Sequence, residues 1–116
     1  MIGSTRQISV YVFSVPVDMR KSFDALSALV TLELKRDLLS GQLFLFVGKD
    51  RRRAKVLYWD GTGVCVFAKR LEQGRFANVW SSDNPQLTTT ELSLFLEGSE
   101  LVGKLKLSPS EFILPT

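Results

Sequence analysis

Residues 42–70 read QLFLFVGKDRRRAKVLYWDGTGVCVFAKR. Three runs rich in aromatic and β-branched residues, 42–47, 54–59 and 63–68, alternate with short polar segments in this stretch. Runs of this kind are typical of strands, and Asp60-Gly61 is a strong signal for a tight hairpin turn. The stretch therefore predicts consecutive strands that pair antiparallel, as in a meander.

Upstream of these strands, the sequence predicts one more strand and a long helix. Apolar residues alternate over 8–13, which indicates a strand that Pro16 ends. Over 19–35, apolar residues recur at helical spacing, and Asp18 is placed to cap the helix that they predict. The main members of this apolar stripe are Met19, Phe23, Leu26 and Val30.

Downstream, the sequence predicts a fifth strand over 75–80 and then a short helix. Thr88 and Glu91 match the spacing of a capping box, in which the two side chains satisfy backbone N–H groups at a helix start. Gly98 is a natural stop for this helix. The last residues, 99–116, include the run KLKLS, which predicts either an extra strand or a strand added to the sheet of a partner.

Together these elements predict an α+β fold with the order β-α-β-β-β-β-α. The sheet is an antiparallel meander of about five strands, with one long N-terminal helix and one short C-terminal helix. We expect one domain over 1–98, followed by the tail 99–116. Strands 42–47 and 63–68 are apolar on both faces, and two helices comfortably cover one face of such a sheet. The second face predicts contact with the tail, another copy of the chain or a different partner.

The composition is typical of a folded protein. The chain has 116 residues, of which 45% are hydrophobic and 23% charged, so it can bury one core. No apolar run reaches the roughly 18 residues that span a membrane. The single cysteine, Cys65, excludes a disulfide within the chain and fits a reducing compartment. We therefore expect a cytoplasmic protein without a membrane partner.

Positive charge is concentrated in the middle of the chain, although the net charge is only +3. Between residues 49 and 75 there are eight Lys or Arg and three acidic residues, whereas the remainder has seven bases and nine acids. A local basic segment is the footprint expected for a polyanion partner. It is also typical of a solvated sheet edge, where cations discourage aggregation.

The candidate nucleic-acid contacts come from this segment and from the start of the first predicted helix. They are Arg20, Lys21, Lys49, Arg51, Arg52, Arg53, Lys55, Lys69, Arg70 and Arg75. The helix dipole disfavours Arg20 and Lys21 in the first turn of that helix. Either a bound phosphate or an acid such as Asp24 would offset this cost.

Two modes of nucleic-acid binding are open for the basic hairpin. It either reads base edges in a major groove or contacts phosphates alone. Three aromatic side chains, Tyr58, Trp59 and Phe67, either stack on unpaired bases or pack in the core or an interface.

The sequence offers little for catalysis. It has no histidine, one cysteine and no glycine-rich phosphate loop, which removes the usual general bases, thiolate metal clusters and nucleotide-binding motifs. We predict no catalytic residue, no bound metal and no cofactor. Carboxylates could still bind magnesium in a nuclease. The strongest candidate for that role is Asp60, which also fits a hairpin turn.

Three separated blocks of the sequence resemble a known family. They are VDMRKSFDALSALV (17–30), SGQLFLFVGKDRRRAKVLYWDGTGVCVFAKRLEQGRF (40–76) and LTTTELSLFLEG (87–98). They resemble the TnpB accessory protein, the second reading frame product, of the insertion sequence 66 family of bacterial transposable elements. Matching motif positions include Arg20, Lys21, Trp59, Asp60, Lys69, Arg70 and Arg75.

The resemblance implies a small protein that is encoded with a larger transposase and is needed for efficient transposition. Strand-transfer chemistry then belongs to the transposase. The leading hypothesis is a non-catalytic accessory factor that binds transposon-associated DNA through the central basic hairpin. The alternative is an adaptor or assembly module for the transposase without direct DNA contact. The partners implied are DNA, the transposase, the other accessory protein of the element and a second copy of the chain.

Overall fold

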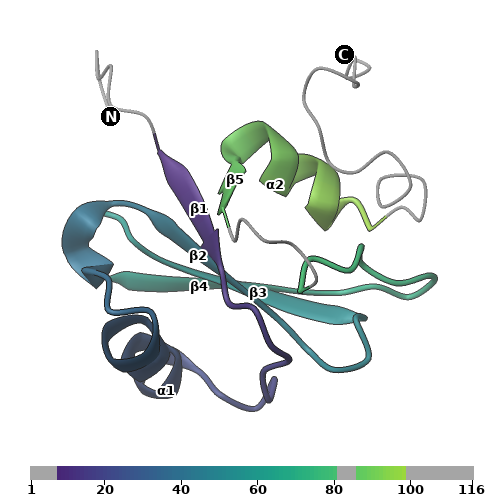
Figure 1. Cartoon of the computed structure of the whole chain (residues 1–116), viewed down its shortest axis with the longest axis horizontal. Helices are drawn as coiled ribbons and strands as arrows, with labels where there is room; N and C mark the ends of the chain where they lie inside the picture. The colour runs from purple at the N-terminus through teal and green to yellow at the C-terminus, as the bar shows by residue number, and fades with distance from the viewer. Residues whose placement is uncertain (1–7, 81–85, 99–116) are drawn as a thin grey trace.

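The computed structural model describes residues 8–80 and 86–98, and Figure 1 shows how their elements are arranged. In chain order these are strand β1 (Ser9–Val12), helix α1 (Phe23–Ala28) with a π-helical continuation (Leu29–Glu33), a 3-10 turn (Leu38–Ser40), strands β2 (Leu43–Val47), β3 (Arg53–Trp59), β4 (Val64–Arg70) and β5 (Gln86–Thr88), and helix α2 (Thr89–Leu96).

The five strands form one mixed sheet in the order β4-β3-β2-β1-β5. β1 and β2 are parallel neighbours, with Val10 opposite Leu43, whereas the other three pairs are antiparallel. The predicted antiparallel meander was therefore wrong for the first strand. The connection between β1 and β2 contains α1 and is long enough for the crossover that a parallel pair requires.

The predicted fifth strand over 75–80 was also wrong. This segment is irregular, and it buries Phe76 and Val79 against the sheet. The rings of Phe76 and Phe95 stack with their centroids 4.8 Å apart, so the segment gains packing contacts in place of strand hydrogen bonds. The fifth strand of the sheet is instead the short β5, next to β1.

Helix α1 begins at Phe23, which is later than the sequence predicts. The Asp18 carboxylate accepts the backbone N–H of Arg20 at 2.9 Å, and the Asp18 carbonyl accepts that of Lys21 at 3.0 Å. These bonds form a turn ahead of the helix, as an Asp side chain favours. The helical segment ends before Lys35, which has a φ of 55°. The prediction of one long helix was therefore wrong, and Arg20 and Lys21 precede the helix.

Each helix covers a different face of the sheet (Figure 1). α1 packs with Leu26 and Val30 on the face that carries Phe44, Phe46 and Leu57. α2 and the irregular segment cover the other face, which carries Val10, Val12, Leu45, Val47, Ala54 and Val56. The sequence predicted that the two helices cover one face and leave the other to the tail, a second copy or a different partner. That expectation was wrong, because the two helices lie on opposite faces.

Both ends of the second helix are as the sequence predicts. The Thr88 side chain accepts the N–H of Glu91 at 3.0 Å, and the Glu91 carboxylate accepts the N–H of Thr88 at 2.8 Å. Gly98 follows the helix with a φ of 72°. The predicted extra strand in 99–116 lies outside the described residues. In the described parts, no helix is long and apolar enough to cross a membrane.

Candidate nucleic-acid interface

Three segments that are distant in the sequence meet at one end of the sheet. The backbone N–H of Val17, after β1, donates to the carbonyl of Val47 at the end of β2. In the turn between β2 and β3, the Arg52 carbonyl accepts the N–H of Leu71 and the Arg51 carbonyl accepts the N–H of Phe76. The loop after β1, the β2–β3 turn and the loop after β4 are therefore held side by side.

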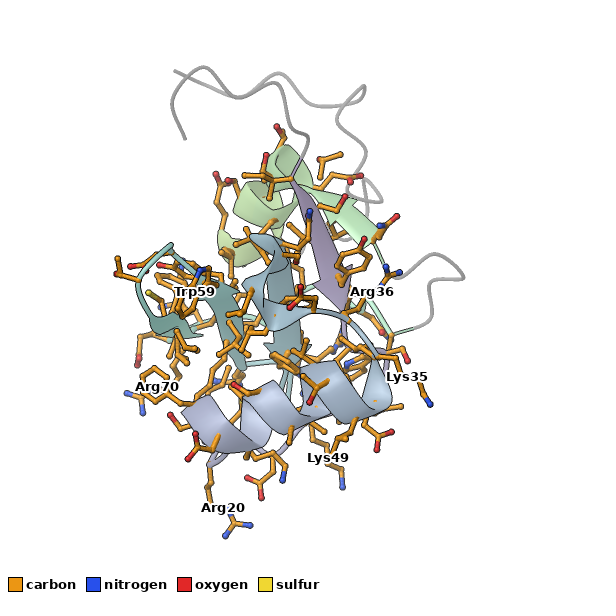
Figure 2. The ribbon with its side chains drawn as sticks, turned by 90° about the vertical axis from the view of Figure 1, so that its left-hand side faces the viewer. Arg20, Lys35, Arg36, Lys49, Trp59 and Arg70 are labelled. Carbon is orange, nitrogen blue, oxygen red and sulfur yellow. The ribbon has the colours of Figure 1, made fainter. Side chains whose placement is uncertain are left out.

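All ten predicted nucleic-acid contacts lie on these three segments or on the adjoining ends of β3 and β4, and we call this set the basic end. The set is Arg20, Lys21, Lys49, Arg51, Arg52, Arg53, Lys55, Lys69, Arg70 and Arg75. Figure 2 shows Arg20, Lys49 and Arg70 projecting outward from the lower half of the molecule. The fold thus gathers cations that the sequence distributes over 56 positions, from 20 to 75.

Three cations of the basic end hold the fold together through backbone carbonyls. Lys55 Nζ donates to the carbonyl of Lys21 at 2.7 Å and fixes the loop ahead of α1. Lys69 Nζ donates to the carbonyl of Leu96 at 2.6 Å, at the last turn of α2. Arg51 Nη1 donates to the carbonyl of Phe76 at 3.3 Å. These three side chains are half-buried, so their polar groups are committed to structure.

The other seven cations of the basic end are exposed. Three of them pair with an acidic neighbour: Arg20 with Asp18 at 2.7 Å, Arg70 with Glu72 at 3.2 Å and Arg53 with Asp50 at 3.9 Å. Lys21, Lys49, Arg52 and Arg75 make no side-chain hydrogen bond or ion pair with the residues that the structure describes. Exposed ion pairs contribute little to stability, so all seven cations can turn to a ligand.

Asp18 and Arg20 form the tightest of these pairs. The Arg20 guanidinium donates to both carboxylate oxygens of Asp18, at distances of 2.7 to 3.1 Å. These hydrogen bonds hold the pKa of the Asp18 carboxyl well below its usual value. The Arg20 side chain is nevertheless 89% exposed, so most of the guanidinium faces solvent.

Two arginines lie directly opposite each other across strands β3 and β4. The strand register pairs Arg53 with Arg70, and both side chains lie on the α1 face of the sheet. Like charges at directly opposed positions destabilise a sheet. Each arginine forms an exposed ion pair with a different acid, Arg53 with Asp50 and Arg70 with Glu72. A bound polyanion would remove the repulsion.

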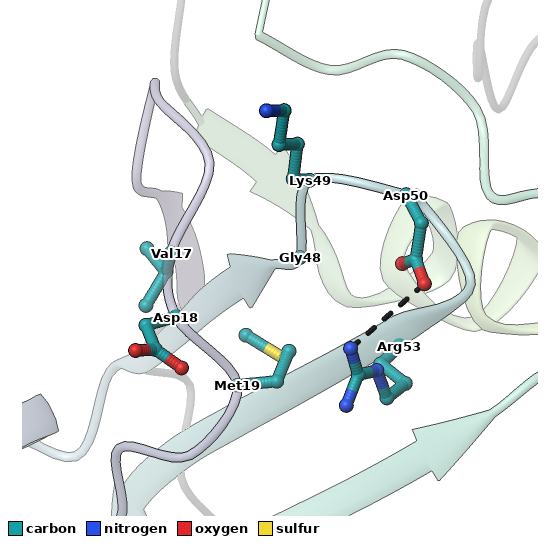
Figure 3. A pocket seen from close by; sticks show the side chains of 7 residues that line it. All are labelled: Val17, Asp18, Met19, Gly48, Lys49, Asp50 and Arg53. Carbon is teal, nitrogen blue, oxygen red and sulfur yellow. Dashed lines mark ion pairs between the residues drawn. The ribbon is translucent and has the colours of Figure 1, made fainter.

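The surface beside this arginine pair is hollowed. A shallow depression of about 500 Å³ lies between the loop after β1 and the β2–β3 turn. Figure 3 shows Asp18 and Met19 on one side of it and Lys49, Asp50 and Arg53 on the other. Because its lining has two acids and two bases, the depression by itself does not favour an anion over a cation.

The predicted stacking aromatics lie away from the basic end. Tyr58 and Trp59 are at the opposite end of β3 from Arg53, which is about 20 Å along an extended strand. Both are half-buried (Figure 2 labels Trp59). Phe67 is in the middle of β4 and 46% exposed, on the α2 face of the sheet. The structure therefore gathers the predicted cations without these three aromatics.

A different aromatic, Phe23, adjoins the basic end. The apolar stripe of the sequence predicts that Phe23 is buried, but its side chain is 49% exposed. It lies two residues after Lys21, whose carbonyl binds Lys55. Sequence reasoning missed this residue because the helix begins at Phe23 itself, so the stripe starts only at Leu26.

Asp60 is a turn residue, as its favoured interpretation predicts. Its carboxylate accepts the backbone N–H groups of Thr62 and Gly63, each at 2.9 Å. These bonds lower the pKa of the Asp60 carboxyl, and the Cys65 thiol donates to it as well. Among the described residues, no group of three or more His, Cys, Asp or Glu side chains could hold a metal ion. The geometry thus gives the nuclease hypothesis no support.

Comparisons with known proteins agree with the sequence motifs. The model of the family described as IS66 Orf2 like protein matches residues 8–105. Two relatives from Sinorhizobium fredii are themselves named as uncharacterized proteins. One, y4hO, is 37% identical over 101 residues, which is 84% of this chain and 86% of the relative. The other, y4jC, is 35% identical over 99 residues, which is 84% of this chain and 85% of the relative. No solved structure matches the chain.

Proposed function

Because the chain belongs to the IS66 Orf2-like family, we propose that it is a non-catalytic accessory factor of insertion-sequence transposition that binds DNA phosphates through the basic end. The observation that carries this proposal is the convergence of three loops, which places seven exposed cations at one end of the sheet. Clustered Lys and Arg on one face are the electrostatic footprint of a nucleic-acid-binding protein.

The topology favours phosphate contacts over base reading by a protruding hairpin. The major groove is wide enough for a two-stranded ribbon but not for a broad sheet, so a ribbon that reads bases must protrude from its sheet. Here β2 pairs with β1 and β3 pairs with β4, so the hairpin is embedded in the middle of the sheet. Only the short turn between β2 and β3 reaches the surface, and Arg51 in this turn is committed to Phe76. Phosphate contact requires no such protrusion.

The dependence of affinity on salt tests this proposal. We expect the triple variant Lys49→Gln/Arg52→Gln/Arg75→Gln to bind a DNA 20-mer more weakly. These cations have no described partner, so their removal leaves the fold intact. If each contacts one phosphate, the log-affinity against log-salt slope for duplex DNA becomes shallower by about 2.7.

A matched control removes cations from the opposite end of the sheet. Lys35 and Arg36 lie ahead of the start of β2, whereas the basic end lies at the opposite end of this strand, next to Val47. Figure 2 labels both residues. Asn suits the positive φ of Lys35, so the control is Lys35→Asn/Arg36→Gln. The control should keep the wild-type slope. An unchanged slope in the triple variant, or equal losses per charge in both variants, would contradict the proposal.

One observation favours a second candidate function, that of an adaptor for the transposase. β4 is the terminal strand of the sheet, and no described residue pairs with its outer edge. The edge is seven residues long, and Phe67 in its centre is 46% exposed. A free strand edge of this kind can accept a strand from another chain. The two functions involve different surfaces, so they are separable by mutation.

A further inference from the structure

Phe23 is an exposed aromatic residue at the start of its helix. Leu26 and Val30 are fully buried under the helical segment, whereas Phe23 is 49% exposed, lies outside both core clusters and is less exposed than Leu32 (69%) farther along. Single exposed apolar residues are common on protein surfaces. The surroundings of this ring therefore decide whether its exposure has a function.

Several cations lie on the face of the sheet that α1 covers or just ahead of this helix. Lys21 is two residues before the first residue of the helix, and the Lys55 ammonium donates to the Lys21 carbonyl at 2.7 Å. Arg53 and Arg70 lie on the same sheet face, and α1 packs over β3 and β4. In Figure 2, Arg20 projects from the lower edge of the molecule and Arg70 from its left edge.

We infer that Phe23 is a stacking site for an unpaired nucleobase, with Lys21, Arg53 and Arg70 binding the flanking phosphates. This inference rests on the proposed function, and it identifies the preferred ligand as single-stranded nucleic acid. Proteins that bind single strands combine a positively charged surface with aromatic rings, because every base has a face that can stack. In a duplex the base faces are already stacked on each other, so the ring has no base to bind.

The backbone that carries the ring is anchored. The N–H of Leu26 donates to the carbonyl of Ser22 at 2.8 Å, which closes the first turn of α1. Lys55 fixes the loop ahead of it, and the buried Leu26 fixes the helix on the sheet. An aromatic side chain on an anchored element loses little entropy when a base stacks on it.

Phe67 provides a matched control on the other face of the sheet. Its exposed fraction, 46%, is close to that of Phe23. It lies opposite Val56 on the α2 face, and the ammonium of Lys69, two residues along the same face of β4, is bonded to the carbonyl of Leu96. A nonspecific contribution of exposed aromatic surface to binding would therefore appear equally at Phe67 and at Phe23.

The experiment compares labelled 20-nucleotide single strands and duplexes of the same sequence at low salt. We expect Phe23→Ala to weaken single-strand binding by roughly 5- to 140-fold, the range measured for one stacked base. Phe23→Trp should retain binding, and Phe23→Leu should lose it while keeping the buried apolar area of the helix start. Duplex affinity should be the same in all three variants, and Phe67→Ala should resemble the wild type.

The outcomes separate this inference from the proposed function. The inference is overturned if the Phe23→Ala variant binds single strands as tightly as the Phe67→Ala variant does. It is also overturned if Phe23→Ala lowers the affinity for single strands and for duplexes by the same factor. In both cases the proposal of DNA binding stands. If Phe23→Leu retains full affinity, the ring acts only through packing and the inference also fails. If the wild type binds neither ligand at low salt, the proposed function itself fails.

Discussion

Lysines and arginines of the basic end differ in what their polar atoms contact. Lys55, Lys69 and Arg51 donate to backbone carbonyls, and each joins two segments that are distant in sequence. Arg52 and Arg75, only a few positions away, are exposed and have no described partner. Sequence reasoning could identify the cations as a group but could not divide them, because the division depends on which carbonyls the fold brings within reach.

Asp60 gives a prediction about pH. Hydrogen bonds from Thr62 and Gly63 lower the pKa of its carboxyl in the folded state below the unfolded value. A lowered folded pKa contributes stability above the unfolded pKa, near pH 4, and this contribution is lost as the pH falls. Asp60→Asn keeps an acceptor oxygen and removes the titration. We expect its stability to fall less steeply than that of the wild type between about pH 5 and 2.

Urea unfolding at pH 6, 4 and 3 measures this difference. The Asp18 carboxyl, whose pKa is also lowered, is present in both proteins and gives the same background slope. Parallel curves for the wild type and Asp60→Asn would show that the turn does not depend on an ionised carboxylate. DNA affinity serves as the control, since Asp60 lies at the far end of β3 from the basic end and its replacement should leave binding unchanged.

At the scale of elements, the sequence predicted strands β2, β3 and β4 and the capping of the second helix. The patterns that succeeded are local: alternation over 42–68, and the spacing of Thr88 and Glu91. These local patterns did not predict the parallel pairing of β1 with β2. That pairing depends on how the crossover through α1 packs on the sheet. The irregular segment 75–80 misled the prediction because it has the apolar content of a strand but packs on the sheet face.

Lys69 joins strand β4 to helix α2. This contact predicts that replacing Lys69 lowers the stability of the fold more than replacing its neighbour Arg70 does. Lys69→Gln removes a charged donor from the C-terminal carbonyls of α2, where a cation also suits the helix dipole. We expect a loss of roughly 1–2 kcal/mol of unfolding free energy. Arg70→Gln, on the other sheet face and exposed, should stay within about 0.5 kcal/mol of the wild type.

The same two variants should rank in the opposite order for DNA binding. Arg70 is exposed and makes only a weak ion pair with Glu72, so we expect it to turn to a phosphate, whereas the Lys69 ammonium is bonded to the Leu96 carbonyl. Chemical denaturation and a DNA titration on both proteins make the comparison. Equal stability losses, or a larger DNA defect in Lys69→Gln than in Arg70→Gln, would contradict the division of the basic end into structural and ligand-binding cations.

For the whole molecule, the covering of both sheet faces changes where a partner can bind. The sequence predicted an apolar face left open, but α1 and α2 cover one face each. In the described residues, the surfaces that remain include the basic end and the outer edge of β4, and Arg70 at the end of β4 lies where these two meet. An accessory factor with two such surfaces could hold DNA and a protein partner at the same time.

This arrangement predicts two variants with opposite defects toward the transposase and toward DNA. Phe67→Asn removes the exposed ring and lowers strand propensity on the β4 edge, so it should reduce co-purification with the transposase and leave DNA affinity unchanged. Lys49→Gln/Arg52→Gln/Arg75→Gln should show the reverse. The pull-down is done with nuclease present, so that DNA cannot bridge the two proteins. A parallel pull-down without nuclease is the comparison. If the transposase co-purifies with the wild type only when nuclease is omitted, DNA bridges the two proteins and a direct contact is excluded. Self-association that Phe67→Asn abolishes would assign the edge to a second copy of the chain.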